Sequence, residues 1–193
     1  MVEWVALGDR AIRFARPSSP PRAIVRAVRA WPHVIDVVVA RDEVAVYFDR
    51  APIVDPDRLV ALASLDEDPV PARDLELRAR YDGPDLDHVA RAIGGSVAEV
   101  RRLHAAALYT VETMGFAPGF AYLTGGDPAL RLPRRTTPRP RVPAGSLAIA
   151  DVFTAVYPFD SPGGWHLIGS VSVPMFGPDG PLLQLGDRVR FVP

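Results

Sequence analysis

The chain has 193 residues, of which 48% are hydrophobic and 23% charged, and its formal net charge is −1 at pH 7. This balance is typical of a globular protein that buries a core, and it offers no overall positive field to nucleic acid or an anionic membrane. The absence of cysteine excludes disulfides, thiolate catalysis and cysteine-based metal sites, and the absence of lysine excludes Schiff-base chemistry.

The N-terminal segment MVEWVALGDRAIRFARP is interrupted by charged residues too early for a secretory signal peptide. No apolar run approaches the roughly 18 residues that a membrane-spanning helix needs. We therefore expect a soluble, cytoplasmic protein.

Strand-like and helix-like segments alternate over the first part of the chain. The expected elements are a strand at Ala11–Ala15, a helix at Ser18–Trp31, a hairpin of Val34–Ala40 and Val44–Asp49, a helix at Asp55–Leu65 and a strand at Arg73–Tyr81. A serine followed by prolines favours the start of the first helix, and an Asp-Pro pair that of the second. The resulting βαββαβ order is typical of a ferredoxin-like α+β unit.

An acidic, proline-flanked segment at Asp66–Pro71 is the best candidate for a domain boundary. We expect a ferredoxin-like domain at residues 1–72 and a second domain at residues 73–193.

Two short helices are expected next, at Pro84–Gly94 and Ser96–Val111, and Ser96 and Glu99 have the spacing of a capping box. The pair resembles a DNA-binding helix-turn-helix, but a glycine turn is common to helical hairpins and no basic arm flanks it. We therefore expect no nucleic-acid partner.

Beyond Met114 the helical periodicity stops, and short apolar runs are separated by proline and glycine. These runs are Ser146–Ala150, Phe153–Phe159, Trp165–Phe176 and Asp187–Pro193. Such a pattern predicts a small closed or partly closed β-barrel.

Common catalytic and metal-binding motifs are missing from the sequence. The histidines, His33, His88, His104 and His166, form no ligand pair at helical spacing, so we expect no metal bound by this chain alone. No nucleophile elbow is present either, and Ser146 is best interpreted as a turn serine.

Three other stretches could carry chemistry. The segment Arg131–Arg141 contains five arginines and no acid, which suits contact with carboxylates or phosphates, although a solvated loop is the alternative. The aromatic residues of Gly115–Gly126 could form a pocket wall or plug one end of the barrel. In Ser161–Gly169 a Gly-Gly turn permits close approach of a ligand, and Trp165 and His166 should point to opposite faces of a strand.

Taken together, these three stretches resemble the allophanate hydrolase subunit 1 family, which includes the B-type component of 5-oxoprolinase and the Kip-type inhibitor of a sporulation histidine kinase. The resemblance rests on GFAPGFAYL, RVPAGS and SPGGW in that order, with GDRAIRF near the start and GDRVRF near the end. It implies a ferredoxin-like domain followed by a cyclophilin-like barrel.

The resemblance also implies that the chain works beside a larger carboxyltransferase-like subunit of the C type and a third subunit of the A type. Such a complex opens the lactam ring of 5-oxoproline to glutamate with ATP, whose site this chain would share with its partner. The alternative within the same family is a regulatory inhibitor that binds a sensor histidine kinase.

The expected site residues fall into three groups. They are the anion contacts Arg134, Arg135, Arg139 and Arg141, the pocket wall Phe116, Gly119, Phe120 and Tyr122, and the adjoining turn Ser161, Gly163, Gly164, Trp165 and His166. His166 could transfer a proton because its ordinary pKa lies near neutrality, and a structural role is equally compatible with the sequence.

One segment departs from the family pattern. Where relatives commonly have Ala-Gly-Gly-Gln-Thr, this chain has Ala150–Thr154 with the sequence ADVFT. Asp151, Val152 and Phe153 thus replace two glycines and a glutamine, which leaves the identity of the substrate open.

Overall fold

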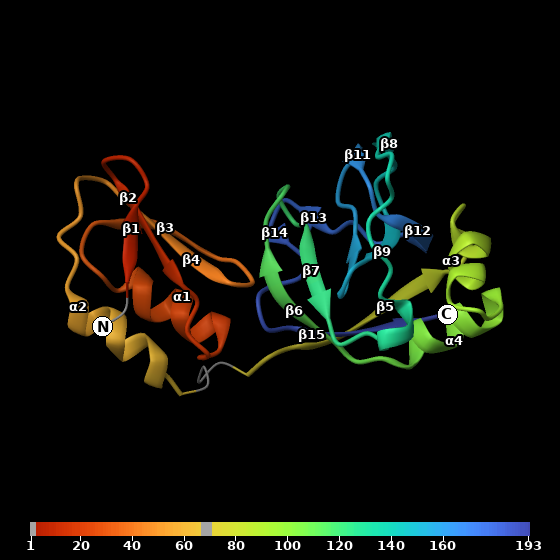
Figure 1. The fold of residues 1–193 in the computed structure, drawn as a ribbon, viewed down its shortest axis with the longest axis horizontal. Coiled ribbons are helices and arrows are strands. Elements are labelled where there is room, and N and C mark those ends of the chain that lie inside the picture. The colour runs from red at the N-terminus through yellow and green to blue at the C-terminus, as the bar shows by residue number, and fades with distance from the viewer. Residues whose placement is uncertain (1–2, 67–70) are drawn as a thin grey trace. The chain divides into compact units, whose positions relative to one another are not determined.

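The computed structural model describes residues 3–66 and 71–193 (Figure 1). The chain divides into two compact units, one formed by the residues up to Pro71 with Glu112–Met114, and the other by Ala72–Val111 and Gly115–Pro193. Part of the expected boundary segment, residues 67–70, lies outside the described residues.

The N-terminal unit is a four-stranded antiparallel sheet with the strand order β1-β2-β4-β3. Its strands are β1 (Trp4–Ala6), β2 (Ala11–Ala15), β3 (Val34–Val39) and β4 (Glu43–Phe48). The predicted hairpin is confirmed, since β3 and β4 pair antiparallel with Val39 opposite Val44.

Two helices, α1 (Pro21–Arg29) and α2 (Pro56–Ala61), supply one wall of this unit's core, and a 3-10 turn, η1 (Leu62–Ser64), follows α2. Ile24 and Val28 of α1 and Leu59 of α2 are buried with the inward-facing side chains of the strands. Asp55 caps α2 by accepting a hydrogen bond from the backbone N–H of Asp57, as its sequence predicts. The serine cap expected for α1 is wrong, because Pro20 occupies the cap position.

The strand expected at Arg73–Tyr81 is confirmed, but its place as the sixth element of an N-terminal βαββαβ unit is wrong. The strand β5 (Asp74–Arg80) belongs to the barrel of the second unit, and β1 takes the edge of the N-terminal sheet beside β2. The strand β1 was not expected, because its three residues are too few to show the alternating pattern by which a strand is recognised in a sequence. The ferredoxin-like arrangement therefore remains a prediction, whereas the mixed α and β composition is confirmed.

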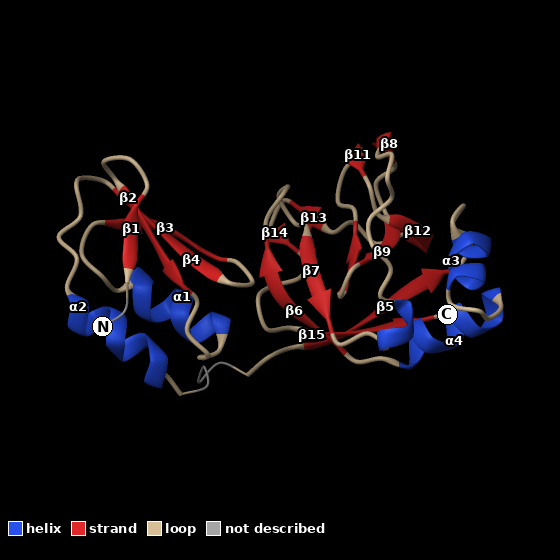
Figure 2. Ribbon diagram, in the orientation of Figure 1, coloured by secondary structure: helices blue, strands red, loops and turns tan. Residues whose placement is uncertain are grey.

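The second unit contains the predicted closed barrel, with the strand order β10-β7-β6-β15-β5-β12-β9 (Figure 2). The strands not yet located are β6 (Tyr109–Met114), β7 (Ala121–Thr124), β9 (Ser146–Ala150), β10 (Phe153–Val156), β12 (His166–Val171) and β15 (Arg188–Val192). Every residue of β9 is buried, which is why its sequence SLAIA is almost continuously apolar.

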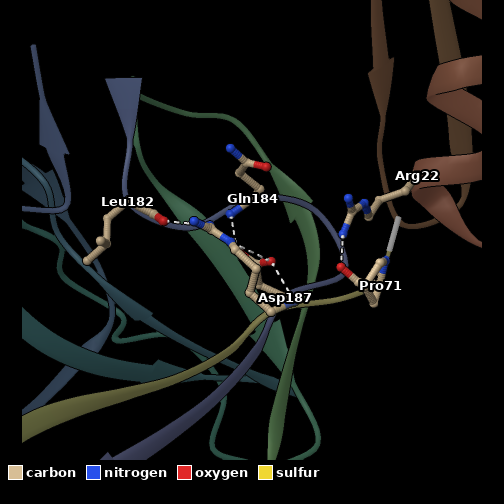
Figure 3. A network of polar contacts seen from close by, with 6 residues as sticks. Arg22, Pro71, Leu182, Gln184 and Asp187 are labelled. Carbon is tan, nitrogen blue, oxygen red and sulfur yellow. Dashed lines mark hydrogen bonds and ion pairs between the residues drawn. The ribbon is translucent and has the colours of Figure 1, made fainter. Parts of the chain in front are cut away.

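The barrel is closed by a parallel pair, since β15 aligns with β5 over its whole length. The buried carboxylate of Asp187 fixes the start of this pair: it accepts hydrogen bonds from the Arg73 guanidinium and from the backbone N–H of Gln184 (Figure 3). Arg73 also donates to the carbonyl of Leu182. A parallel neighbour cannot be joined by a tight turn, so side chains hold the two strand ends together.

Two helices, α3 (Leu86–Ala92) and α4 (Val97–Ala106), pack beside the barrel strands β12 and β15. The capping residue expected for α4 is confirmed, because the Ser96 hydroxyl accepts a hydrogen bond from the backbone N–H of Glu99. Shorter elements complete the unit. They are the turn η2 (Pro128–Leu130), the ribbon of β8 (Arg139–Val142) with β11 (Ser161–Gly163), and the pair β13 (Phe176–Gly177) and β14 (Gly180–Pro181).

Within residues 3–66 and 71–193, no helix is both long enough and apolar enough to cross a lipid bilayer.

Candidate functional site

A pocket of about 90 Å³ lies among the three stretches that the sequence singled out. Phe116 and Phe120 come from the turn between β6 and β7, and Tyr122 from β7 itself. The other lining residues are Arg134, Tyr157, Pro162, Gly163, Gly164 and Trp165. The pocket therefore joins the arginine-rich loop, the aromatic turn and the Gly-Gly turn, segments far apart in the sequence.

Its walls are aromatic rings that meet edge to face. The buried ring of Phe120 lies at the centre, with its centroid 4.9 Å from Tyr122, 5.3 Å from Tyr157 and 5.7 Å from Trp165. Such edge-to-face pairs fix the orientation of each ring. Burial raises the pKa of the Tyr122 and Tyr157 hydroxyls, which therefore stay protonated at neutral pH and can donate hydrogen bonds.

Gly163 is required by the shape of this pocket. A Cβ atom placed on Gly163 would lie 2.2 Å from the hydroxyl oxygen of Tyr157, far closer than any non-bonded contact allows. At Gly164 the nearest atoms would be 3.8 Å away, which is an ordinary contact. The first glycine of the pair thus leaves room for the tyrosine.

Phe116 lies at the mouth of the pocket in a strained backbone conformation. Its φ angle is 72°, in the left-handed region that a bulky residue rarely adopts, and the residue is 63% exposed. Strain of this kind persists where the surrounding structure imposes it, and it is concentrated at functional sites. An exposed aromatic ring held in this way is suited to covering a ligand.

Arg134 is the charged residue among those lining the pocket. Its guanidinium carbon lies 6.0 Å from the ring centroid of Trp165, and its Nε lies 3.8 Å from a carboxylate oxygen of Asp151. At 3.8 Å this is an ion pair without a hydrogen bond. The guanidinium N–H groups can therefore bind a carboxylate or a phosphoryl group in the pocket.

Arg135 and Arg139 converge instead on the buried carboxylate of Asp85. Their guanidinium nitrogens lie 2.9 Å and 2.7 Å from the same oxygen, and the other oxygen accepts a hydrogen bond from the backbone N–H of Leu167. Burial by itself would raise the pKa of Asp85, but these hydrogen bonds and charges hold it below its usual value. The two arginines thus brace the Arg131–Arg141 loop against β12.

Arg141, Ser161 and Gly119 lie outside the pocket lining. Arg141 pairs with Asp160. Ser161 pairs with Val142 in the β8–β11 ribbon. These two residues therefore hold the ribbon together rather than face the pocket.

Trp165 and His166 point to different surroundings, as the alternation along a strand predicts. Trp165 lines the pocket, whereas the buried His166 ring stacks on His88 with centroids 5.2 Å apart and hydrogen-bonds through Nε2 to the carbonyl of Pro133. These contacts favour a structural role for His166, and the proton-transfer role stays untested.

The segment that departs from the family pattern forms the turn between β9 and β10. Asp151 has a φ of 52°, and its backbone N–H donates to the carbonyl of Leu132 at 2.6 Å. Phe153 packs against the pocket aromatics, with its ring 5.5 Å from Tyr122 and 6.4 Å from Trp165. The Phe153 ring, which stands where relatives commonly have a glutamine, therefore packs against two of the aromatic rings that line the pocket.

His104 of α4 is fully buried, and both of its ring nitrogens have hydrogen-bond partners. Tyr81 hydrogen-bonds to its Nδ1 and Thr154 to its Nε2, each at 2.9 Å, and burial lowers the pKa of His104 to about 3. It is therefore neutral and structural. In the described part of the chain no three histidine, cysteine or acidic side chains gather to hold a metal.

Comparisons with known proteins agree with this fold. The model of the carboxyltransferase domain, subdomain C and D, matches residues 9–183, and the chain therefore belongs to this family. The resemblance found from the sequence is confirmed by curated relatives: the B-type component of 5-oxoprolinase from Bacillus subtilis (strain 168) is 36% identical over 96% of this chain and 90% of its own length.

Two solved structures are similar to this chain in fold. TTHA0988 superposes with a TM-score of 0.81 and is 37% identical over 95% of this chain. The chain spans 40% of the length of TTHA0988. The conserved uncharacterized protein PH0987 from Pyrococcus horikoshii gives a TM-score of 0.60 at 28% identity and covers 99% of this chain and 97% of its own length.

Sequence reasoning did not include three residues in the candidate site. They are Tyr157, which lines the pocket, Asp85, which pairs with Arg135 and Arg139, and Asp151, which pairs with Arg134. Tyr157 stands at the start of the stretch YPFDSPGGW, and a tyrosine shortly before a Gly-Gly pair could have indicated a ring that needs the glycine. No local signal marks the two aspartates, because their partners lie elsewhere in the chain.

Proposed function

We propose that this chain is the B-type component of an ATP-dependent 5-oxoprolinase, which hydrolyses 5-oxoproline to glutamate together with a larger carboxyltransferase-like subunit and a third subunit. The observation that carries the proposal is the match to the B-type component of 5-oxoprolinase along nearly the whole length of both chains. The pocket supports it, because flat aromatic walls suit a small ring and Arg134 suits its carboxylate.

The size of the pocket limits what this chain contributes. At about 90 Å³ it can hold a small ring or a single phosphoryl group, and it is much smaller than the roughly 300–1,000 Å³ of typical ligand pockets. ATP supplies the phosphoryl group that activates the stable lactam carbonyl. We therefore infer that the partner binds most of the nucleotide, whereas this chain orients the reacting end and shields it from water.

Each pocket residue then has a role in this scheme. Arg134 holds an anionic group of the ligand, and the Tyr122 and Tyr157 hydroxyls donate hydrogen bonds to developing negative charge. The ring of Phe116 covers the mouth. Activity by this chain alone is not expected, because its sequence contains no lysine for a phosphate, and Arg134 is the only charged side chain among the described residues that line the pocket.

The test is reconstitution with the candidate partner subunits, followed by an assay of ATP-dependent glutamate release from 5-oxoproline. We expect Arg134→Gln to reduce kcat/KM at least 100-fold, the loss typical of removing one stabilising donor from an active site. The matched control is Arg131→Gln, in the same loop but outside the pocket lining, which should retain activity.

Full activity of Arg134→Gln would contradict the role of the pocket. A reconstituted complex that assembles without turnover of 5-oxoproline would point to another amide substrate. Failure of the subunits to assemble, together with binding of this chain to a sensor histidine kinase in a separate binding assay, would favour the inhibitory function instead.

A further inference from the structure

The carboxylate of Asp151 stands beside the cation of the pocket. Its distance to Arg134 Nε is 3.8 Å, and the two side chains are 50% and 60% exposed. Among the described residues, the Arg134 guanidinium makes no hydrogen bond and no second ion pair. An anionic ligand that reaches Arg134 must therefore approach a fixed negative charge as well.

The position of Asp151 does not depend on this weak ion pair. Its backbone N–H donates at 2.6 Å to the carbonyl of Leu132, two residues before Arg134, so the turn and the arginine loop are joined through their main chains. The left-handed φ of 52° is uncommon for a residue with a side chain, although aspartate and asparagine tolerate it best. The backbone thus places the residue that bears the carboxylate beside the arginine loop independently of the ion pair.

We propose that Asp151 determines specificity by limiting the charge of the ligand that Arg134 accepts, favouring a singly charged carboxylate over a dianion such as a free phosphate group. This inference deepens the proposed function, since it concerns the ligand class of the same pocket. By Coulomb's law in water, a charge about 5 Å away weakens binding of a monoanion roughly 4-fold and of a dianion roughly 15-fold. The carboxylate therefore disfavours dianions by several-fold.

The experiment uses the isolated full chain at low ionic strength, where screening is weak. Acetate and inorganic phosphate at pH 8, where phosphate is mainly a dianion, are titrated separately, and the indole N–H resonance of Trp165 reports binding by NMR. We expect Asp151→Asn to strengthen binding of acetate roughly 4-fold and of phosphate roughly 15-fold. Asparagine keeps the side-chain size and tolerates the same φ, so the turn should persist.

The matched control is Asp179→Asn, which removes the same charge from an exposed turn whose carboxylate, unlike that of Asp151, is not paired with Arg134. Equal changes in the two variants, or equal gains for acetate and phosphate, would overturn the proposal. So would the absence of binding by either probe to Asp151→Asn. Arg134→Gln should abolish the response in both backgrounds, and a response that survives it would place the anion elsewhere.

The outcome is separable from that of the proposed function. A charge-dependent gain in the isolated chain combined with a reconstituted complex that does not hydrolyse 5-oxoproline would contradict the function and leave the specificity role intact. An active complex without the gain would contradict the specificity role alone.

Discussion

At the scale of single residues, the pocket depends on groups that compete for the same space or charge. Gly163 leaves space for the Tyr157 hydroxyl, and a carboxylate oxygen of Asp151 lies 3.8 Å from Arg134 Nε. Asp85 holds two further arginines that the sequence alone would assign to anion binding. Within the Arg131–Arg141 loop, the ion pairs with Asp85 and Asp151 therefore decide which arginines are held in place and which one faces the pocket.

A substitution at the Gly-Gly turn tests this account of the pocket. We expect Gly163→Ala to lower the free energy of unfolding by about 1–3 kcal/mol, the usual effect of overpacking, and to displace the Tyr157 ring. Thermal unfolding would measure the change in stability, and the chemical shift of the Trp165 indole N–H would report the displacement of the Tyr157 ring. Gly164→Ala is the matched control and should leave both nearly unchanged, since its Cβ has room. Equal stability of the two variants would show that Tyr157 moves aside without penalty.

At the scale of elements, buried polar side chains join the helix pair to the barrel. His104 of α4 bridges Tyr81, which follows β5, and Thr154 of β10, whose hydroxyl donates in turn to the carbonyl of Ala148. Because Thr154 donates to Ala148, it accepts from His104 Nε2, and Nδ1 accepts from Tyr81. A neutral histidine satisfies every member of this network.

The network predicts how stability depends on pH. The unfolded chain protonates His104 below about pH 6.5, whereas the folded protein does so at about 3, so the free energy of unfolding should fall as pH drops between these values. His104→Gln should be less stable at pH 7 by about 1–3 kcal/mol, because a buried partner is left unsatisfied. Its stability should also fall less steeply below pH 6.5, by up to about 1.4 kcal/mol per pH unit.

Denaturant unfolding between pH 7 and 4 would measure both quantities, with the exposed His88→Gln as control. If the free energy of unfolding of the wild type and of His104→Gln varied with pH in the same way, His104 would take up its proton in the folded state at its ordinary pKa, which would contradict the prediction.

At the scale of the whole molecule, the barrel is built from segments at both ends of the second unit. β5 opens this unit and β15 closes it, and the two lie side by side in parallel with Arg188 opposite Asp74. The pocket residues all come from the same unit. We therefore expect this unit to fold and to form the pocket by itself.

This expectation can be tested by truncation. A fragment of residues 72–193 should unfold cooperatively. Acetate and phosphate should shift its Trp165 indole N–H resonance as they do in the full chain. A fragment of residues 81–193 lacks β5 and should fail to fold, because the barrel would be opened between β15 and β12. A 72–193 fragment that does not fold would show that the barrel depends on the N-terminal unit.

The sequence by itself determined the kinds of elements, the closed barrel, the family and most of the pocket wall. Periodicity, proline and glycine placement and helix caps act over a few residues, so they can be interpreted locally. Only the tertiary structure decided that β5 joins the barrel, that Tyr157 needs Gly163, and that Arg134 faces the pocket while Asp85 takes Arg135 and Arg139. Asp85 precedes Arg135 and Arg139 by about 50 residues, and such pairings are set by how the strands close the barrel.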